Sequence, residues 1–125
     1  MAPLSRSALG AAGEAAAAAW LEARGYQILD HNVRTRFGEI DLVARIGDVI
    51  VFVEVKSRTS ARFGHPSEAV TAGKQHRLAR LASGYLHVKG LDDHLARFDA
   101  VAVQLDARGG VIALEHIPDA FCPGG

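Results

Sequence analysis

The feature that most constrains this chain is a pair of runs rich in Val, Ile and Leu on either side of Ile46-Gly47-Asp48. Together the two runs occupy residues 38–58. The Gly-Asp pair favours a tight turn, so the segment predicts a β-hairpin. Val49 to Val53 is apolar at every position, which indicates a strand covered on both faces. The fold is therefore expected to be organised around this hairpin.

Three charged residues occupy unusual places in the hairpin. Asp41 lies within its first strand, and Glu54 and Lys56 lie near the end of its second. Because side chains alternate between the faces of a strand, Glu54 and Lys56 share a face with Phe52. An even-length turn around Gly47 would place Asp41 opposite Phe52 and diagonal to Glu54. We therefore expect the three charges to converge, whereas a turn of odd length would separate them.

The same pattern has structural explanations. Charges alternate with apolar residues on the solvated side of an ordinary antiparallel hairpin. At the end of a strand covered on both faces, a carboxylate and an ammonium would instead be partly buried, and buried charges are paired or have a function. The residues alone support a structural ion pair and a working site equally.

Four stretches carry a resemblance to known proteins: Gly13-Glu14, Asn32-x-Arg34-x-Arg36-x-Gly38-Glu39-Ile40-Asp41-Leu42-Val43, Val51-Phe52-Val53-Glu54-Val55-Lys56-Ser57-Arg58 and Arg97-Phe98-Asp99. An Asp on one strand and Glu-x-Lys on the next resemble the active-site signature of the PD-(D/E)xK nuclease superfamily. More closely, the chain resembles the YraN-type family of small bacterial proteins, which is related to archaeal-type Holliday junction resolvases. The resemblance runs from about Gly13 to about Val103. One departure from the superfamily signature is Ile40 in place of Pro before Asp41.

The resemblance implies a site that hydrolyses phosphodiester bonds with a divalent cation. Asp41 and Glu54 offer hard oxygen ligands that suit Mg²⁺ or Mn²⁺, and the Val55 carbonyl can add a third protein ligand. Lys56 is expected to orient the attacking water and to stabilise the transition-state phosphate. Glu14 interrupts an alanine-rich segment; the resemblance implies a fourth acidic site residue, and a solvated helix residue is the alternative.

The overall charge provides no electrostatic case for nucleic acid, because 14 Lys and Arg balance 14 Asp and Glu. Basic residues nevertheless gather after the hairpin, and between Lys56 and Lys89 the one acid is Glu68. Such a patch can face a phosphate backbone, although a solvated helix face has the same composition. We expect DNA or another nucleic acid as the partner, and a homodimer would combine two basic patches. The candidate contacts are Arg34, Arg36, Arg58, Arg62, Lys74, Gln75 and Arg77.

Several of these positions have structural alternatives. Arg34 and Arg36 point the same way in an extended chain and can pair with Glu39 instead of phosphate. Lys74 has helical spacing with Leu78, which places it on the side of its helix that faces the sheet. We expect Lys74 to reach the charged end of the hairpin, with a lysine snorkelling at a helix start as the alternative.

The remaining pattern predicts an α/β domain of the order αβββαββ, with a mixed central β-sheet flanked by helices. The resemblance implies the same arrangement, the restriction-endonuclease-like fold. Residues 1–117 form a single domain in this prediction, and residues 118–125 form a loose tail. Asp99 is expected to be a structural partner of an arginine. The predicted elements besides the hairpin are a helix at 8–24 capped by Ser7, a strand at 26–34, a helix that follows a loop at 59–66 and is broken near Ala72-Gly73, and strands at 97–105 and 111–117.

Some classes of protein are excluded. Cys122 is the one cysteine, so no internal disulfide can form, and a cytoplasmic location is expected. Glu14 interrupts the apolar N-terminal run, which argues against an export signal, and no stretch is apolar enough to span a membrane. The six histidines lack zinc-ligand spacing. Two function classes remain: a metal-dependent nuclease, and a non-catalytic nucleic-acid- or protein-binding module with the nuclease fold.

Overall fold

The computed structural model describes residues 3–59 and 72–121. Two helices and five strands follow one another as αβββαββ, which confirms the predicted α/β architecture with a mixed sheet. Each helix has 17 residues, and neither of these described helices is long and apolar enough to cross a membrane. The elements are α1 (Arg6–Glu22), β1 (Gln27–Thr35), β2 (Gly38–Ile46), β3 (Val49–Arg58), α2 (Ala72–Val88), β4 (Leu95–Leu105) and β5 (Val111–Phe121).

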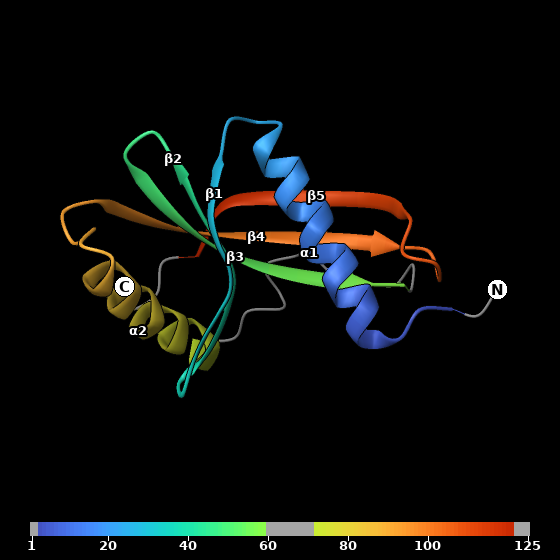
Figure 1. Cartoon of the computed structure of the whole chain (residues 1–125), viewed down its shortest axis with the longest axis horizontal. Helices are drawn as coiled ribbons and strands as arrows, with labels where there is room; N and C mark the ends of the chain where they lie inside the picture. The colour runs from blue at the N-terminus through green and yellow to red at the C-terminus, as the bar shows by residue number, and fades with distance from the viewer. Residues whose placement is uncertain (1–2, 60–71, 122–125) are drawn as a thin grey trace.

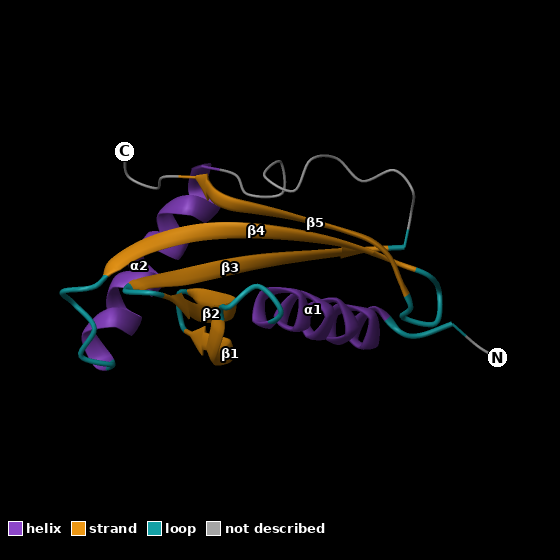
Figure 2. Cartoon of the chain, turned by 90° about the horizontal axis from the view of Figure 1, so that it is seen from above, coloured by secondary structure: helices purple, strands orange, loops and turns teal. Residues whose placement is uncertain are grey.

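The five strands lie in the sheet in their sequence order (Figure 1). Neighbouring strands pair antiparallel except β3 and β4, which are parallel and are connected through α2. Such a crossover is what a parallel pair requires, because a tight turn cannot join two strands that run the same way. Figure 2 shows β1 and β2 turned away from the common direction of β3, β4 and β5. The sheet therefore opens between β2 and β3.

One helix covers each face of the sheet. Under α1, Leu42, Val51, Val53, Val101 and Val103 pack with Ala17 and Leu21. On the other face, Ile40, Val43, Ile50 and Phe52 pack with Leu78, Leu81, Ala82 and Tyr85 of α2. The strand β3 thus contributes alternate residues to both clusters, as its continuous apolar run predicts.

The register of the hairpin differs from the prediction by two residues. Ile46 pairs with Val49, so Gly47-Asp48 forms the turn, and Gly47 adopts a φ of 57°. A glycine at the first central position suits the mirror-image turns that match strand twist. Phe52 therefore pairs with Val43, not with Asp41. The turn is still even in length, so the predicted parity of the two strands is confirmed.

The first helix begins earlier than predicted. Ser5, not Ser7, is the N-cap, because its hydroxyl oxygen accepts a hydrogen bond from the Ala8 amide at 3.1 Å. Ala19 is exposed, whereas Ala17 and Ala18 are buried. Alanine carries little phase information, so an alanine-rich sequence does not by itself show which face of its helix is buried. The buried residues of α1 are Gly13, Ala17, Ala18 and Leu21.

The last strand continues to Phe121, which corrects the prediction that the loose tail begins at residue 118. Phe121 pairs with Phe98 of β4, and their rings stack with centroids 5.1 Å apart. Pro118 is tolerated there because β5 is an edge strand, where one backbone donor can be missing. Residues 122–125 lie outside the described part of the chain.

Candidate functional site

The site predicted from the hairpin lies where β2 and β3 part. Their pairing ends at Leu42 and Val53, whereas β3 continues beside β4 as far as Arg58. Asp41 and Glu54 are the next residues on the two strands. Figure 1 shows β2 leaving towards its turn with β1 while β3 runs on along β4. Both acids therefore stand at the edge of an opening in the sheet.

Asp41 is held to the neighbouring strand through its side chain. Its Oδ2 accepts a hydrogen bond from the backbone N–H of Val55 at 2.8 Å. Burial and, after it, the charge of Glu54 raise the pKa of Asp41 to about 7, although the Val55 hydrogen bond opposes the rise. An acid with these neighbours resists ionisation until a positive charge approaches.

Two further carboxylates approach Asp41. Glu14 of α1, Glu39 of β2 and Asp41 each place one carboxylate oxygen within 4.8 Å of the others. Burial raises the pKa of Glu14, a hydrogen bond with the Asn32 side chain lowers it, and the charge of Glu39 raises it. Three carboxylates at this separation can share a hard divalent cation. We call Glu14, Glu39 and Asp41 the acidic cluster.

A distortion of β1 lies beside this cluster. Asn32 lies between the residues that pair with Leu42 and Ile40, hence level with Asp41, and its φ is 49°. Such a left-handed conformation is uncommon for a residue other than glycine. Leu42 packs towards α1, yet Ile40 packs with Val43 towards α2, so the regular alternation of β2 breaks at Asp41. The break in β2 and the distortion of β1 therefore lie side by side at the acidic cluster.

Gly13 allows α1 to bring Glu14 to the site. Gly13 is buried against β3, and a Cβ atom at this position would overlap the Ser57 hydroxyl and lie 2.9 Å from the Ser57 Cβ. Only a residue without a side chain lets the helix lie this close to the strand. Glu14, the next residue, consequently reaches the opening between β2 and β3.

Glu54 is paired with a lysine of α2. It is 9% exposed and forms an ion pair with the Lys74 ammonium of α2. The structure therefore places Lys74 at the charged end of the hairpin, as its helical phase predicts. Glu54 lies close enough to Asp41 to raise its pKa, but it is outside the group of three acids within 4.8 Å. Glu39, which was not a predicted site residue, belongs to that group, and Glu54 as a metal ligand stays a prediction.

The role of Glu39 was missed because it has a plausible surface partner. The Nε atom of Arg34 lies 3.3 Å from Oε2 of Glu39. This ion pair is the alternative to a phosphate contact that the sequence suggested for Arg34. The signal that could have identified Glu39 was its alternation with Asp41, since residues two apart on a strand point the same way. The Val55 amide binds Asp41, and the Val55 carbonyl as a metal ligand stays a prediction.

Lys56 lines a hollow beside the acidic cluster. It is half-buried and, within residues 3–59 and 72–121, has no recorded hydrogen bond or ion pair. The hollow has a volume of about 580 Å³, and Glu14, Arg6 and Arg58 also line it. We call this the α1 hollow. Arg6 was not a predicted contact, because the predicted helix began after it.

The other predicted contacts lie on the opposite side of the cluster or outside the described residues. Arg77 and Lys74 line a smaller hollow of about 250 Å³ together with Glu39. Arg36 is exposed at the turn between β1 and β2, and Gln75 is half-buried in α2. Arg62 lies in the part of the chain that is not described. The acidic cluster therefore stands between two hollows that carry basic side chains.

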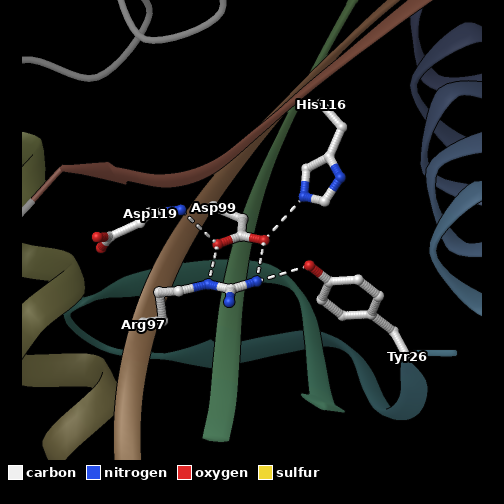
Figure 3. A network of polar contacts seen from close by, with 5 residues as sticks. All are labelled: Tyr26, Arg97, Asp99, His116 and Asp119. Atoms are coloured by element: carbon white, nitrogen blue, oxygen red, sulfur yellow. Dashed lines mark hydrogen bonds and ion pairs between the residues drawn. The ribbon is translucent and has the colours of Figure 1, made fainter. Parts of the chain in front are cut away.

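Asp99 has the structural role expected of it (Figure 3). It is 0% exposed, and its carboxylate accepts two hydrogen bonds from Arg97, at 2.8 and 3.0 Å. His116 lies 2.8 Å from the same carboxylate, and the Asp119 amide donates to it at 2.9 Å. Arg97 also contacts the Tyr26 hydroxyl at 2.6 Å. The network ties β4 to β5 and to the residue that precedes β1.

Comparison with known proteins identifies similar chains. Residues 13–103 match the family described as "Uncharacterised protein family UPF0102". A UPF0102 protein of Syntrophus aciditrophicus is 54% identical over 112 residues, covering 90% of this chain and 87% of the relative. One from Symbiobacterium thermophilum is 58% identical over 96 residues, covering 77% and 81%. One from Moorella thermoacetica is 49% identical over 118 residues, covering 94% and 98%. The matched residues include the acidic cluster and the Glu54-Val55-Lys56 stretch.

Proposed function

The chain belongs to the UPF0102 family, as its YraN-type motifs predicted, and we propose that it is a metal-dependent nuclease that hydrolyses phosphodiester bonds in branched or otherwise structured DNA. The observation that carries this proposal is the acidic cluster. Its three carboxylates come from α1 and β2 and lie within 4.8 Å of one another. They stand beside a lysine and between two basic hollows.

The electrostatics of the acidic cluster favour a bound Mg²⁺ or Mn²⁺ over three ionised carboxylates without a cation. Burial and mutual repulsion raise the pKa values of both Asp41 and Glu14, so the site disfavours the charged forms of its own residues. Perturbed acids gathered in an opening of the fold are a feature of functional sites. Carboxylate oxygens are the ligands that these hard cations prefer. Glu14, Glu39 and Asp41 would hold the ion.

The side chains of the protein then have separate tasks. A bound divalent cation would supply Lewis acidity and lower the pKa of a coordinated water. The Val55 amide holds Asp41 in place, and Lys74 holds Glu54 next to it. Lys56 lines the α1 hollow and has no hydrogen-bond or ion-pair partner within residues 3–59 and 72–121, so we assign its ammonium to orienting water and stabilising charge on the phosphate. Arg58 and Arg6 would bind the phosphate backbone.

The alternative function is a non-catalytic module that binds nucleic acid or protein. The balance of 14 basic and 14 acidic residues favours the protein-binding form of this alternative, because a basic excess is the electrostatic footprint of nucleic-acid binding. A homodimer would remove this objection by placing two sets of basic hollows side by side. The two functions differ in whether a bound strand is cut.

The test is cleavage by the purified protein with Mg²⁺ or Mn²⁺. Single-stranded, duplex, flap and four-way DNA are each supplied, and Asp41→Asn is the matched inactive variant. We expect cleavage of at least one branched substrate by the wild type and none by Asp41→Asn. Tight binding without cleavage of any substrate would instead support the binding module.

A further inference from the structure

We propose that a third hollow, between the β1–β2 turn and α2, receives an unpaired nucleobase of the bound nucleic acid and stacks it against Phe37. The hollow has a volume of about 570 Å³, which is in the range of small-ligand sites. We call it the Phe37 hollow. The inference rests on the proposed function to the extent that the base belongs to the strand whose phosphate lies at the acidic cluster.

Phe37 is an exposed aromatic residue in a fixed position. Phe37 is 45% exposed at the tip of the turn, so its ring is not needed to fill the core of the fold. Its amide donates a hydrogen bond to the Thr35 Oγ1 at 3.0 Å, and Gly38 follows with a φ of 139°. The turn is thereby held in one shape. Figure 1 shows this turn reaching the level of α2, whose Leu81 and Tyr85 also line the hollow.

Two arginines flank the Phe37 ring. The guanidinium carbon of Arg36 lies 4.9 Å from the ring centroid, and that of Arg80 lies 5.3 Å from it. Cation–π contacts at these distances restrain the ring and leave the outer guanidinium nitrogens for phosphate. An aromatic ring among basic side chains is the combination that binds single-stranded nucleic acid, because any base can stack and the cations follow the backbone.

A carboxylate that lines the hollow favours a base over a phosphate. Asp30 lines it, accepts a hydrogen bond from the Tyr85 hydroxyl at 3.0 Å and lies 3.7 Å from the Lys89 ammonium. A carboxylate repels a phosphate, but it can accept hydrogen bonds from the exocyclic amino groups of bases. Arg36 and Arg80, which also line the hollow, have the opposite preference. We therefore expect the base to lie beside Asp30 and its phosphates beside the arginines.

The Phe37 hollow adjoins the smaller hollow beside the proposed cleavage site. Phe37 and Leu81 line both this hollow and the smaller one that contains Glu39 and Arg77. Glu39 belongs to the acidic cluster. A strand with its phosphate at the cluster can thus pass Arg77 and present a neighbouring base to Phe37. A base inside a duplex cannot reach the ring, which predicts a preference for DNA with unpaired nucleotides beside the site.

The experiment measures DNA affinity in Ca²⁺, where binding is followed without relying on cleavage. A duplex with an internal unpaired nucleotide is compared with the perfect duplex for the wild type, Phe37→Leu, Phe37→Trp and the matched control Ile112→Ala. Ile112 is an exposed apolar residue on β5, away from the hollow. We expect Phe37→Leu to weaken binding of the unpaired substrate by about 5-fold or more and to leave the duplex affinity unchanged. Phe37→Trp, which keeps an aromatic ring, should bind the unpaired substrate about as tightly as the wild type does.

The outcomes separate this inference from the nuclease proposal. Photocrosslinking of 5-iodouracil at the unpaired position should label Phe37 in the wild type and in Asp41→Asn alike, since the latter keeps the hollow. Equal loss of both affinities in Phe37→Leu, or crosslinking elsewhere, would overturn the base site even if the protein cuts DNA. A mononucleotide that competes as strongly as the DNA would also overturn it, because a free nucleotide would then be the occupant. A Phe37-dependent preference without cleavage would support the base site and contradict the nuclease.

Discussion

The Asp41 carboxylate accepts a hydrogen bond from the Val55 amide at 2.8 Å, although the two strands that carry these residues no longer pair beyond Leu42 and Val53. The side chain thus replaces a missing backbone contact at the point where the sheet opens. It also keeps an acid facing Glu54, whose charge helps raise its pKa. The surroundings of Asp41 therefore destabilise its ionised form in the folded protein.

The first prediction concerns Asp41→Asn in the absence of divalent cations. The folded pKa of Asp41 is about 7 against a reference value of 3.8, so the folded protein binds more protons between these values than the unfolded chain. The contribution of Asp41 to stability therefore falls as pH rises from about 4 to about 7. We expect Asp41→Asn to raise the free energy of unfolding by roughly 1 to 3 kcal/mol at pH 8, and by much less at pH 4. Thermal and denaturant unfolding in EDTA at both pH values measure this.

Divalent cations should reverse the ranking of the two proteins. An ion that binds the folded state at 100 times its Kd stabilises that state by about 2.7 kcal/mol, and Asp41→Asn lacks one of the ligands. We expect millimolar Mg²⁺ or Mn²⁺ to raise the Tm of the wild type and of Asp48→Asn, an exposed acid at the hairpin turn, but not that of Asp41→Asn. Equal responses in all three would show that the ions bind elsewhere.

The second prediction concerns the close approach of α1 to β3. Gly13→Ala should destabilise the fold by about 1 to 3 kcal/mol and weaken the stabilisation by Mg²⁺, because the added methyl group meets Ser57 and displaces Glu14. Gly10→Ala is the control, since nothing lies within 4 Å of its added Cβ and alanine favours helix. The double variant Gly13→Ala/Ser57→Gly should recover most of the loss. Failure of that rescue would mean that contact with Ser57 is not the cause.

The third prediction separates chemistry from binding at Lys56. If its ammonium acts mainly on the transition state, Lys56→Ala should reduce cleavage by about 100-fold or more while the affinities for Mg²⁺ and DNA stay nearly unchanged. Single-turnover cleavage and DNA binding in Ca²⁺ measure the two effects separately. A parallel loss of affinity and rate would assign Lys56 to substrate binding instead.

The fourth prediction concerns Arg58 and Arg77, which line hollows on the two sides of the acidic cluster. As phosphate contacts, each should on removal weaken DNA binding similarly for all sequences and reduce the salt dependence by about one unit of slope. Arg45→Ala is the control, because Arg45 hydrogen-bonds the Gly47 carbonyl at the far end of the hairpin. Binding is measured over a salt series in Ca²⁺. An unchanged slope in either variant would remove that residue from the proposed interface.

The fifth prediction concerns the buried network of Figure 3. Asp99→Ala leaves Arg97 without its carboxylate partner inside the fold and should destabilise the protein by about 3 to 5 kcal/mol. The folded fraction should still respond to Mg²⁺ as the wild type does, because Asp99 is not part of the acidic cluster. A loss of the Mg²⁺ response with the fold intact would connect the two sites.

Much of the architecture was determined locally and could be predicted. The apolar run of β3, the glycine at the hairpin turn and the helical phase of Leu78 and Tyr85 each depend on residues close in sequence. Which faces of β2 and β3 coincide follows from the two-residue period of a strand and from an even-length turn. This part of the prediction therefore holds even though the observed register differs from the predicted one by two residues. The pairing of Asp99 with Arg97 was likewise predictable, because the two alternate on one strand.

Tertiary structure decided which acids meet. Glu14 reaches Glu39 and Asp41 because Gly13 lets α1 lie against Ser57, a contact between residues far apart in the sequence. Glu54 turns to Lys74 because α2 returns over the other face of the sheet. The extension of β5 to Phe121 likewise depends on Phe98, its partner on β4. The sequence alone determined the elements and their faces, since these follow from local periodicity, whereas the membership of the site depended on packing between distant segments, which no local pattern encodes.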